Sequence, residues 1–129
     1  MPHPRSAALV QALATVPHEH FLGPGPWQIA APTPSGTYRT TEDANLRHLY
    51  HKVVVAIDAT RHLNNGQPGF LALLIEALEP QRGDRVVHIG CGLGYYTAIV
   101  AAVVGPAGSV TAIELDPTLA AQAGTNLCD

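Results

Sequence analysis

The chain has 129 residues, of which 47% are hydrophobic and 13% charged, and its formal net charge is −3. This composition predicts one compact domain and excludes a disordered tail. The scattered charges form no basic stripe, so we expect no nucleic-acid partner. No apolar run approaches the roughly 20 residues of a membrane span, and the N-terminus lacks a signal-peptide core, so we expect a cytoplasmic protein with no membrane partner. Cys91 and Cys128 are expected to be free thiols.

The N-terminal segment begins with a helix and continues without a clear period. Ser6 is suited to cap a helix that runs to Thr15 and ends before Pro17. The stretch 23–40 is rich in Gly, Pro, Ser and Thr, so we expect an irregular surface segment. Because long loops in compact domains are often functional, this segment is a candidate lid, with a flexible connector as the alternative.

The sequence pattern in the middle of the chain predicts two helices and an extended run. We expect a short helix over residues 42–49, capped by Thr40 or Thr41, because acidic residues follow this cap where the helix dipole favours them. Residues 53–57 form an extended apolar run. Pro68 is suited to be the first residue of a helix whose apolar positions recur at intervals of three and four.

From residue 84 onward, strand and helix alternate. The pattern predicts a strand over 85–89, a glycine-rich turn over 90–94, a helix over 95–104, a strand over 109–114, and a helix that Asp116 caps, Pro117 opens and Leu127 approximately ends. This order is that of a βαβ unit with parallel strands and a right-handed crossover. We therefore divide the chain into a helical and irregular segment, 1–66, and a βαβ-containing part, 67–129.

The glycine-rich turn is the strongest sign of ligand binding. Gly90, Gly92 and Gly94 leave room for a ligand beside the backbone, and the following helix presents free N–H groups. Twenty-four positions after Gly90, Glu114 ends the second strand, where a carboxylate can accept hydrogen bonds from ribose hydroxyls. Tyr95 stands where a dinucleotide motif has its third glycine, which disfavours NAD. The observed spacing favours S-adenosylmethionine, with a purely structural turn as the alternative.

Three ordered motifs resemble the protein-L-isoaspartate O-methyltransferase family. They are Val-Pro-His-Glu-His-Phe at 16–21, Gly-Gln-Pro at 66–68, and Gly-Asp-Arg-Val-Val-His-Ile-Gly-Cys-Gly-Leu-Gly-Tyr at 83–95. The resemblance implies an α/β, Rossmann-like class I methyltransferase fold, represented here by its helical N-terminal segment and first βαβ unit. It also implies S-adenosylmethionine as cofactor and a protein or peptide carboxylate as methyl acceptor.

The resemblance further implies which residues form the site. The loop glycines would line the methionine end of the cofactor, Glu114 would hold the ribose, and Leu115 would touch the adenine. The expected cofactor-binding residues are His88, Gly90, Cys91, Gly92, Gly94, Tyr95, Glu114 and Leu115. The acceptor-side candidates are Asn64, Asn65, Gly66 and Gln67.

The chain departs from the family pattern in two residues and in length. His88 stands where the family has an acidic residue, and Gly66 where it has a serine. Because glycine cannot position an acceptor through a side chain, methyl transfer to a divergent acceptor is a better-supported expectation than isoaspartate repair. The sequence stops within the second crossover helix, so we expect self-association or a further C-terminal portion to complete the sheet. The alternatives are a non-catalytic cofactor-binding or interaction module and an NAD-dependent oxidoreductase.

The other histidines and the tyrosines give weaker evidence for a functional site. His18 and His20 flank Glu19, but no third ligand has suitable spacing, so we expect no metal site and partly exposed histidines. Of Tyr95 and Tyr96, we expect one in the core and the other at the edge of the cofactor crevice.

Overall fold

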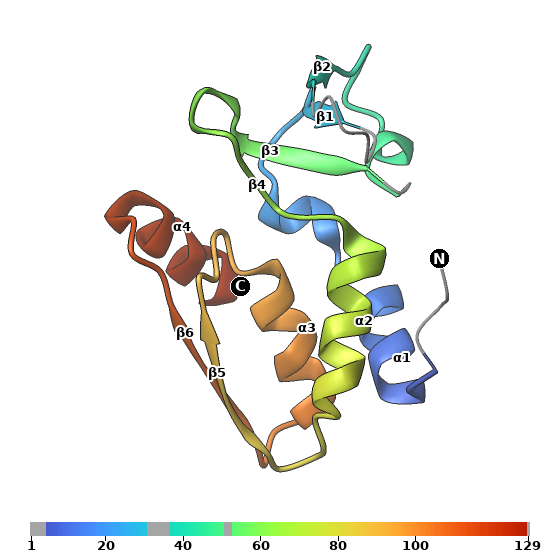
Figure 1. Cartoon of the computed structure of the whole chain (residues 1–129), viewed down its shortest axis with the longest axis vertical. Helices are drawn as coiled ribbons and strands as arrows, with labels where there is room; N and C mark the ends of the chain where they lie inside the picture. The colour runs from blue at the N-terminus through green and yellow to red at the C-terminus, as the bar shows by residue number, and fades with distance from the viewer. Residues whose placement is uncertain (1–4, 31–36, 51–52, 129) are drawn as a thin grey trace.

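The computed structural model describes residues 5–30, 37–50 and 53–128 (Figure 1). Four α-helices, six strands and three short 3-10 helices follow one another along these parts of the chain. In order they are α1 (Ala7–Thr15), η1 (His18–Phe21), β1 (Gln28–Ala30), β2 (Arg39–Thr40), η2 (Leu46–His48), β3 (Val54–Asp58), η3 (Ala59–Arg61), β4 (Leu63–Asn64), α2 (Pro68–Leu78), β5 (Arg85–Ile89), α3 (Tyr95–Val104), β6 (Ser109–Ile113) and α4 (Pro117–Cys128).

The C-terminal half is the predicted βαβ unit. Strands β5 and β6 are parallel and in register from Arg85 opposite Ser109 to Ile89 opposite Ile113. Helix α3 lies between this pair of strands and α1 (Figure 1). The expected strand, turn and helix boundaries from residue 85 to 104 are confirmed. The chain therefore has the α/β architecture that its alternating pattern predicted.

Helix α3 is apolar around most of its circumference because it is packed on several sides. The main core cluster joins α1, η1 and α3, and consists of Leu9, Ala12, Phe21, Tyr95, Tyr96, Ile99 and Val103. Ile99 has no exposed surface. The outer face of the strand pair is open instead, with Val87 61% and Ile89 77% exposed.

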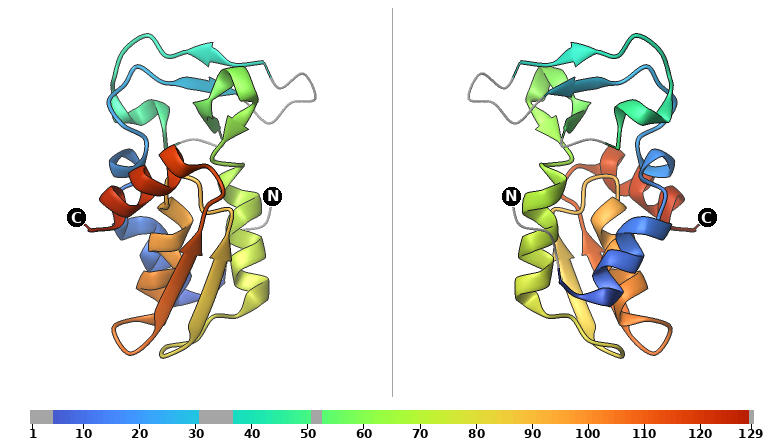
Figure 2. Two further views of the ribbon diagram at one scale, coloured as in Figure 1. Left: turned by 90° about the vertical axis from the view of Figure 1, so that its left-hand side faces the viewer. Right: turned by 90° about the vertical axis from the view of Figure 1, so that its right-hand side faces the viewer.

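A second, antiparallel sheet stands beyond the C-terminal ends of β5 and β6 (Figure 2). Its strand order is β2-β1-β3-β4, and its own small core consists of Trp27, Ile29, Leu49 and Val55. Because the carboxyl ends of parallel strands are where α/β folds bind ligands, this sheet is positioned to form one wall of a site.

The helix signals in the sequence are confirmed where they are local. The Ser6 hydroxyl accepts a hydrogen bond from Leu9 N at 3.3 Å, Pro68 opens α2, and Asp116 Oδ1 accepts from Thr118 N at 2.9 Å. None of the helices in the described ranges is long and apolar enough to span a bilayer.

Two expectations for the N-terminal half are wrong. The stretch 23–40 is not irregular throughout, because β1 and β2 pair across it, Gln28 opposite Thr40; its residues 31–36, which belong to the candidate lid, lie outside the described residues. The helix expected over 42–49 is reduced to η2, capped by Asn45. Thr41 caps no helix, because its hydroxyl accepts from Trp27 N and donates to Asp43 O, which ties this segment to β1.

Candidate functional site

The glycine-rich turn between β5 and α3 is held in a conformation that requires glycine. Gly90, Gly92 and Gly94 have φ values of 77°, 56° and 96°, all in the left-handed region that disfavours side chains. Gly90 N and Cys91 N both donate to the carbonyl of Ile113, at 2.7 and 3.1 Å. The end of β6 therefore fixes the start of the turn.

Glu114, directly after β6, binds the backbone of the same turn. Its Oε1 accepts from Gly92 N and its Oε2 from Asp116 N, both at 2.9 Å. These two hydrogen bonds, from Asp116 first and then Gly92, lower the pKa of the Glu114 carboxyl below its ordinary value. Each oxygen of an ionised carboxylate can accept two hydrogen bonds, so each retains acceptor capacity for a ligand.

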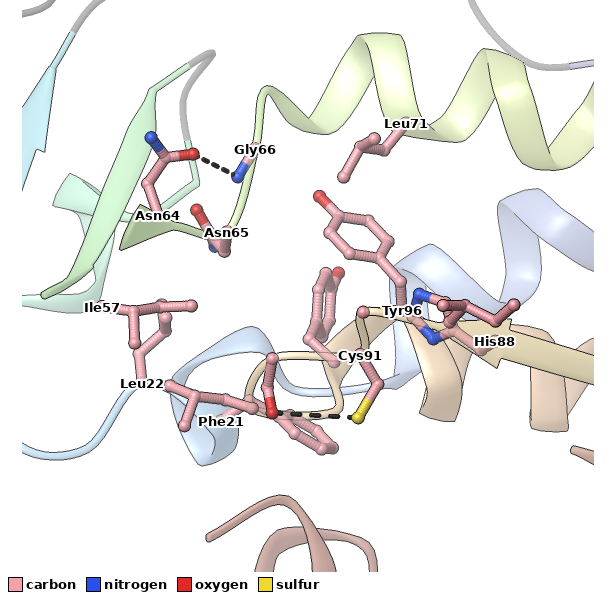
Figure 3. A pocket seen from close by; sticks show the side chains of 15 residues that line it. Phe21, Leu22, Ile57, Asn64, Asn65, Gly66, Leu71, His88, Cys91 and Tyr96 are labelled. Carbon is pink, nitrogen blue, oxygen red and sulfur yellow. Dashed lines mark hydrogen bonds between the residues drawn. The ribbon is translucent and has the colours of Figure 1, made fainter. Parts of the chain in front are cut away.

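Two adjoining cavities open beside the turn and have Ile57, Asn64, Gly90 and Gly92 in both walls. The first cavity has a volume of about 350 Å³ (Figure 3). It is lined by Phe21, Leu22, Ile57, Asn64, Asn65, Gly66, Leu71, His88, Ile89, Gly90, Cys91, Gly92, Leu93, Tyr95 and Tyr96. The second, of about 430 Å³, is lined by Ile57, Arg61, Leu63, Asn64, Gly90, Gly92, Glu114, Leu115, Asp116 and Leu119. The fold thus brings most of the expected site residues to one place.

Two of the expected residues line neither cavity. Gly94 packs against α4, since a Cβ there would lie 3.2 Å from Leu127. The side chain of Gln67 caps α2 by accepting from Phe70 N. Their positions give them roles in folding the site rather than in its walls.

The asparagines on the acceptor side differ in what their side chains do. Asn65 Oδ1 accepts from Val55 N at 3.0 Å, and its Nδ2 lies 2.6 Å from His18 Nε2, so this side chain is bound on both ends. Asn64 Oδ1 accepts from Gly66 N at 2.8 Å, and its Nδ2 donates to the Tyr38 hydroxyl. Asn64 borders both cavities, whereas Asn65 borders the first alone.

Gly66 has a backbone reason to be glycine. Its φ is +79°, and a Cβ there would lie 2.7 Å from Leu71 Cδ1. A serine at this position would therefore be strained and crowded. The wall of the first cavity at this point consists of backbone and Leu71.

His88 is half-buried in the first cavity, and its Nδ1 lies 2.7 Å from Thr97 Oγ1. Burial lowers the pKa of His88 below its ordinary value, so the ring is neutral near pH 7. The first cavity therefore holds no charged side chain among its lining residues.

The expectation that the histidines of the first motif are partly exposed is wrong for His18. This side chain is 4% exposed and stacks on Tyr95, with ring centroids 4.0 Å apart. Burial lowers the pKa of His18 to about 4. His20 Nε2 lies 2.9 Å from the carbonyl oxygen of Asn126, and no group of three metal-ligating side chains occurs in the described ranges.

The two tyrosines do not divide between the core and the edge of the crevice as expected. Tyr95 and Tyr96 are both buried, and both line the first cavity. Arg61 joins the small sheet to α4 by contacting Asp58 and Asp116, each at 2.8 Å, at the border of the second cavity. No periodicity marks Arg61; the short spacing from Asp58 was its only signal.

Most of the chain matches a known protein family. A family model described as protein-L-isoaspartate(D-aspartate) O-methyltransferase matches residues 33–129. The chain belongs to this family.

Individual relatives match over part of their length. The protein-L-isoaspartate O-methyltransferase of Ignicoccus hospitalis is 40% identical over 83 residues, which are 64% of this chain and 38% of that protein. Protein-L-isoaspartate O-methyltransferase 1 of Archaeoglobus fulgidus is 35% identical over 89 residues, 63% of this chain and 41% of that protein. The chain thus spans well under half the length of these relatives.

A solved structure of a protein-L-isoaspartate O-methyltransferase superposes with a TM-score of 0.71 and 27% sequence identity. The match covers 95% of this chain and 33% of that one. It confirms that the fold is part of a class I, Rossmann-like methyltransferase fold.

Proposed function

We propose that this chain forms the S-adenosylmethionine-binding part of a methyltransferase whose acceptor is a carboxylate on a protein or peptide. The observation that carries the proposal is the hydrogen bond from Gly92 N to Glu114, which joins the glycine-rich turn and a ribose-binding carboxylate at one crevice. The relatives that the chain resembles are named as protein-L-isoaspartate O-methyltransferases, which supports this reading over the two alternatives.

The residues present suit this cofactor. Glu114 retains acceptor capacity for two ribose hydroxyls, and Leu115, 96% exposed on the edge of the second cavity, offers an apolar surface for adenine. The first cavity, without a cationic side chain, does not repel a sulfonium. In the first cavity, Gly90, Cys91 and Gly92 would border the methionine end of the cofactor. Tyr95 and His88 line the same cavity.

The contribution of the chain to the reaction is to align the methyl donor with the acceptor. S-adenosylmethionine, when bound, supplies a methyl group that a carboxylate can accept directly. The chain's part is to hold donor and acceptor in line and to keep water out, and positioning of this kind can lower a barrier by about 7–11 kcal/mol. The aromatic and aliphatic walls of the first cavity, from Phe21, Ile57 and Leu71, serve both tasks.

Calorimetry and a transfer assay test the proposal. The protein at its full encoded length should bind S-adenosylhomocysteine and not NAD, and should move labelled methyl groups from S-adenosylmethionine to a peptide with one isoaspartyl residue. A matched aspartyl peptide is the control for acceptor preference. Binding of NAD alone would contradict the proposal.

One observation favours a non-catalytic module as the second candidate: Gly66 presents no side chain to an acceptor. That candidate predicts cofactor binding without methyl release to any peptide. The same two assays therefore separate the candidates.

A further inference from the structure

The hydroxyl of Tyr96 is buried but makes no hydrogen bond. Tyr96 is 8% exposed, and its hydroxyl is the one buried side-chain nitrogen or oxygen in the described ranges that has no hydrogen-bond partner. A buried polar group without a partner costs about 1–3 kcal/mol. Such groups in folded proteins call for an explanation, and an absent ligand is one.

The position of Tyr96 points to a ligand in the first cavity. Tyr96 belongs to the wall of this cavity, and Figure 3 shows its side chain between His88 and Leu71. The second cavity, which holds Glu114, does not include Tyr96. A ligand that contacts Tyr96 therefore lies in the first cavity, whereas the proposed ribose site lies in the second.

The two asparagines and the histidine of this cavity already have partners. Asn64 and Asn65 are bound at both ends of their amides, and His88 Nδ1 is bound to Thr97. Burial raises the pKa of the Tyr96 phenol, so it remains protonated and can donate. A neutral donor in an apolar cavity without acidic side chains is suited to an anionic oxygen, because hydrogen bonds to charged groups are the stronger ones.

We propose that the Tyr96 hydroxyl donates a hydrogen bond to a carboxylate bound in the first cavity. Leu71 is half-buried in the same wall and packs over Gly66, so an aliphatic side chain borders the space that this ligand would occupy. The inference rests on the proposed function. Two carboxylates meet the description, that of the methyl acceptor and that of the methionine part of the cofactor.

Tyr96→Phe in the full-length protein removes the hydroxyl and keeps the ring. Loss of a hydrogen bond to a charged group should weaken the carboxylate's binding about tenfold or more. Thermal stability without ligand should stay level or rise, because the orphaned hydroxyl is gone; a structural hydroxyl would make it fall. Tyr50→Phe, which removes a phenol bonded to Glu19 outside both cavities, is the control expected to keep wild-type binding.

The arms of the experiment separate the two sources. A tenfold rise in the peptide KM with unchanged S-adenosylhomocysteine affinity assigns the acceptor. A tenfold weaker affinity for S-adenosylhomocysteine, without change for 5′-methylthioadenosine, which lacks the amino-acid part, assigns the cofactor carboxylate. Unchanged values in both arms, or a large fall in thermal stability, overturn the inference. A wild-type protein that binds S-adenosylhomocysteine but methylates no peptide would contradict the proposed transfer and leave the cofactor arm to decide on Tyr96.

Discussion

Glu114 Oε1 accepts a hydrogen bond from Gly92 N at 2.9 Å, although the two residues are 22 positions apart in sequence. The contact joins the turn after β5 to the end of β6. One carboxylate thereby both shapes the glycine-rich turn and faces the second cavity, where the proposed ribose would lie.

Glu114→Ala should weaken S-adenosylhomocysteine binding by about 1.5–3 kcal/mol, because a charged hydrogen-bond acceptor is lost. Isothermal titration calorimetry on the full-length protein measures this change. Glu42→Ala, at an exposed position outside both cavities, is the matched control. Equal affinities for Glu114→Ala and the wild type would remove Glu114 from the cofactor site.

Gly92→Val should reduce cofactor binding at least as much as Glu114→Ala. The first added carbon has ordinary room, 3.5 Å from Ile57 Cδ1, so the damage comes from the left-handed φ of +56° and from the branched side chain in the crevice. Gly83→Val provides the control, because Gly83 has a φ of +88° with nothing within 4 Å of the added carbon and lies outside both cavities.

Calorimetry and thermal melts separate the two effects of these glycine substitutions. Both variants should lose about 1–2 kcal/mol of stability from backbone strain. Gly92→Val alone should lose affinity. If Gly92→Val binds like the wild type, the turn is only a structural connection.

Buried His18 should make the protein less stable in mild acid. Its pKa is lowered from 6.5 to about 4, chiefly by burial, so between these values the unfolded chain binds the proton that the folded chain excludes. This contribution to stability is complete above pH 6.5 and is lost as the pH falls toward about 4. At 1.36 kcal/mol for each pH unit, the loss amounts to about 3 kcal/mol.

Urea unfolding at several pH values from 7.5 to 4.5 measures this loss. His18→Gln keeps a neutral hydrogen-bonding side chain and should flatten the dependence while lowering stability at pH 7.5. If the slopes of the variant and the wild type coincide, His18 does not titrate as its burial implies.

A polypeptide of these 129 residues should self-associate, because the outer face of the β5–β6 pair exposes Val87, Ile89 and Ile113 at 61%, 77% and 49%. Light scattering over a range of concentrations tests this. Val87→Lys should shift the equilibrium toward monomer, whereas Val10→Lys on α1, also exposed, should not. A wild-type monomer at every concentration would contradict the expectation.

Local signals in the sequence determined much of the fold. Ser6, Pro68 and Asp116 begin helices through hydrogen bonds or a fixed φ within a few residues, so their effect can be read without knowing the rest of the chain. The need for glycine in the turn after β5 is equally local, since the positive φ values of Gly90, Gly92 and Gly94 disfavour any side chain there.

Tertiary structure decided what depends on distant partners. Thr41 has the chemistry of a helix cap but bonds to Trp27 and Asp43, because β1 lies beside it. His18 becomes buried only when Tyr95 stacks on it, and Tyr96 faces the first cavity only because α3 is packed among α1, α2 and β5. Burial and pairing across the chain set these roles, and neither is a property of the residue or its neighbours in sequence.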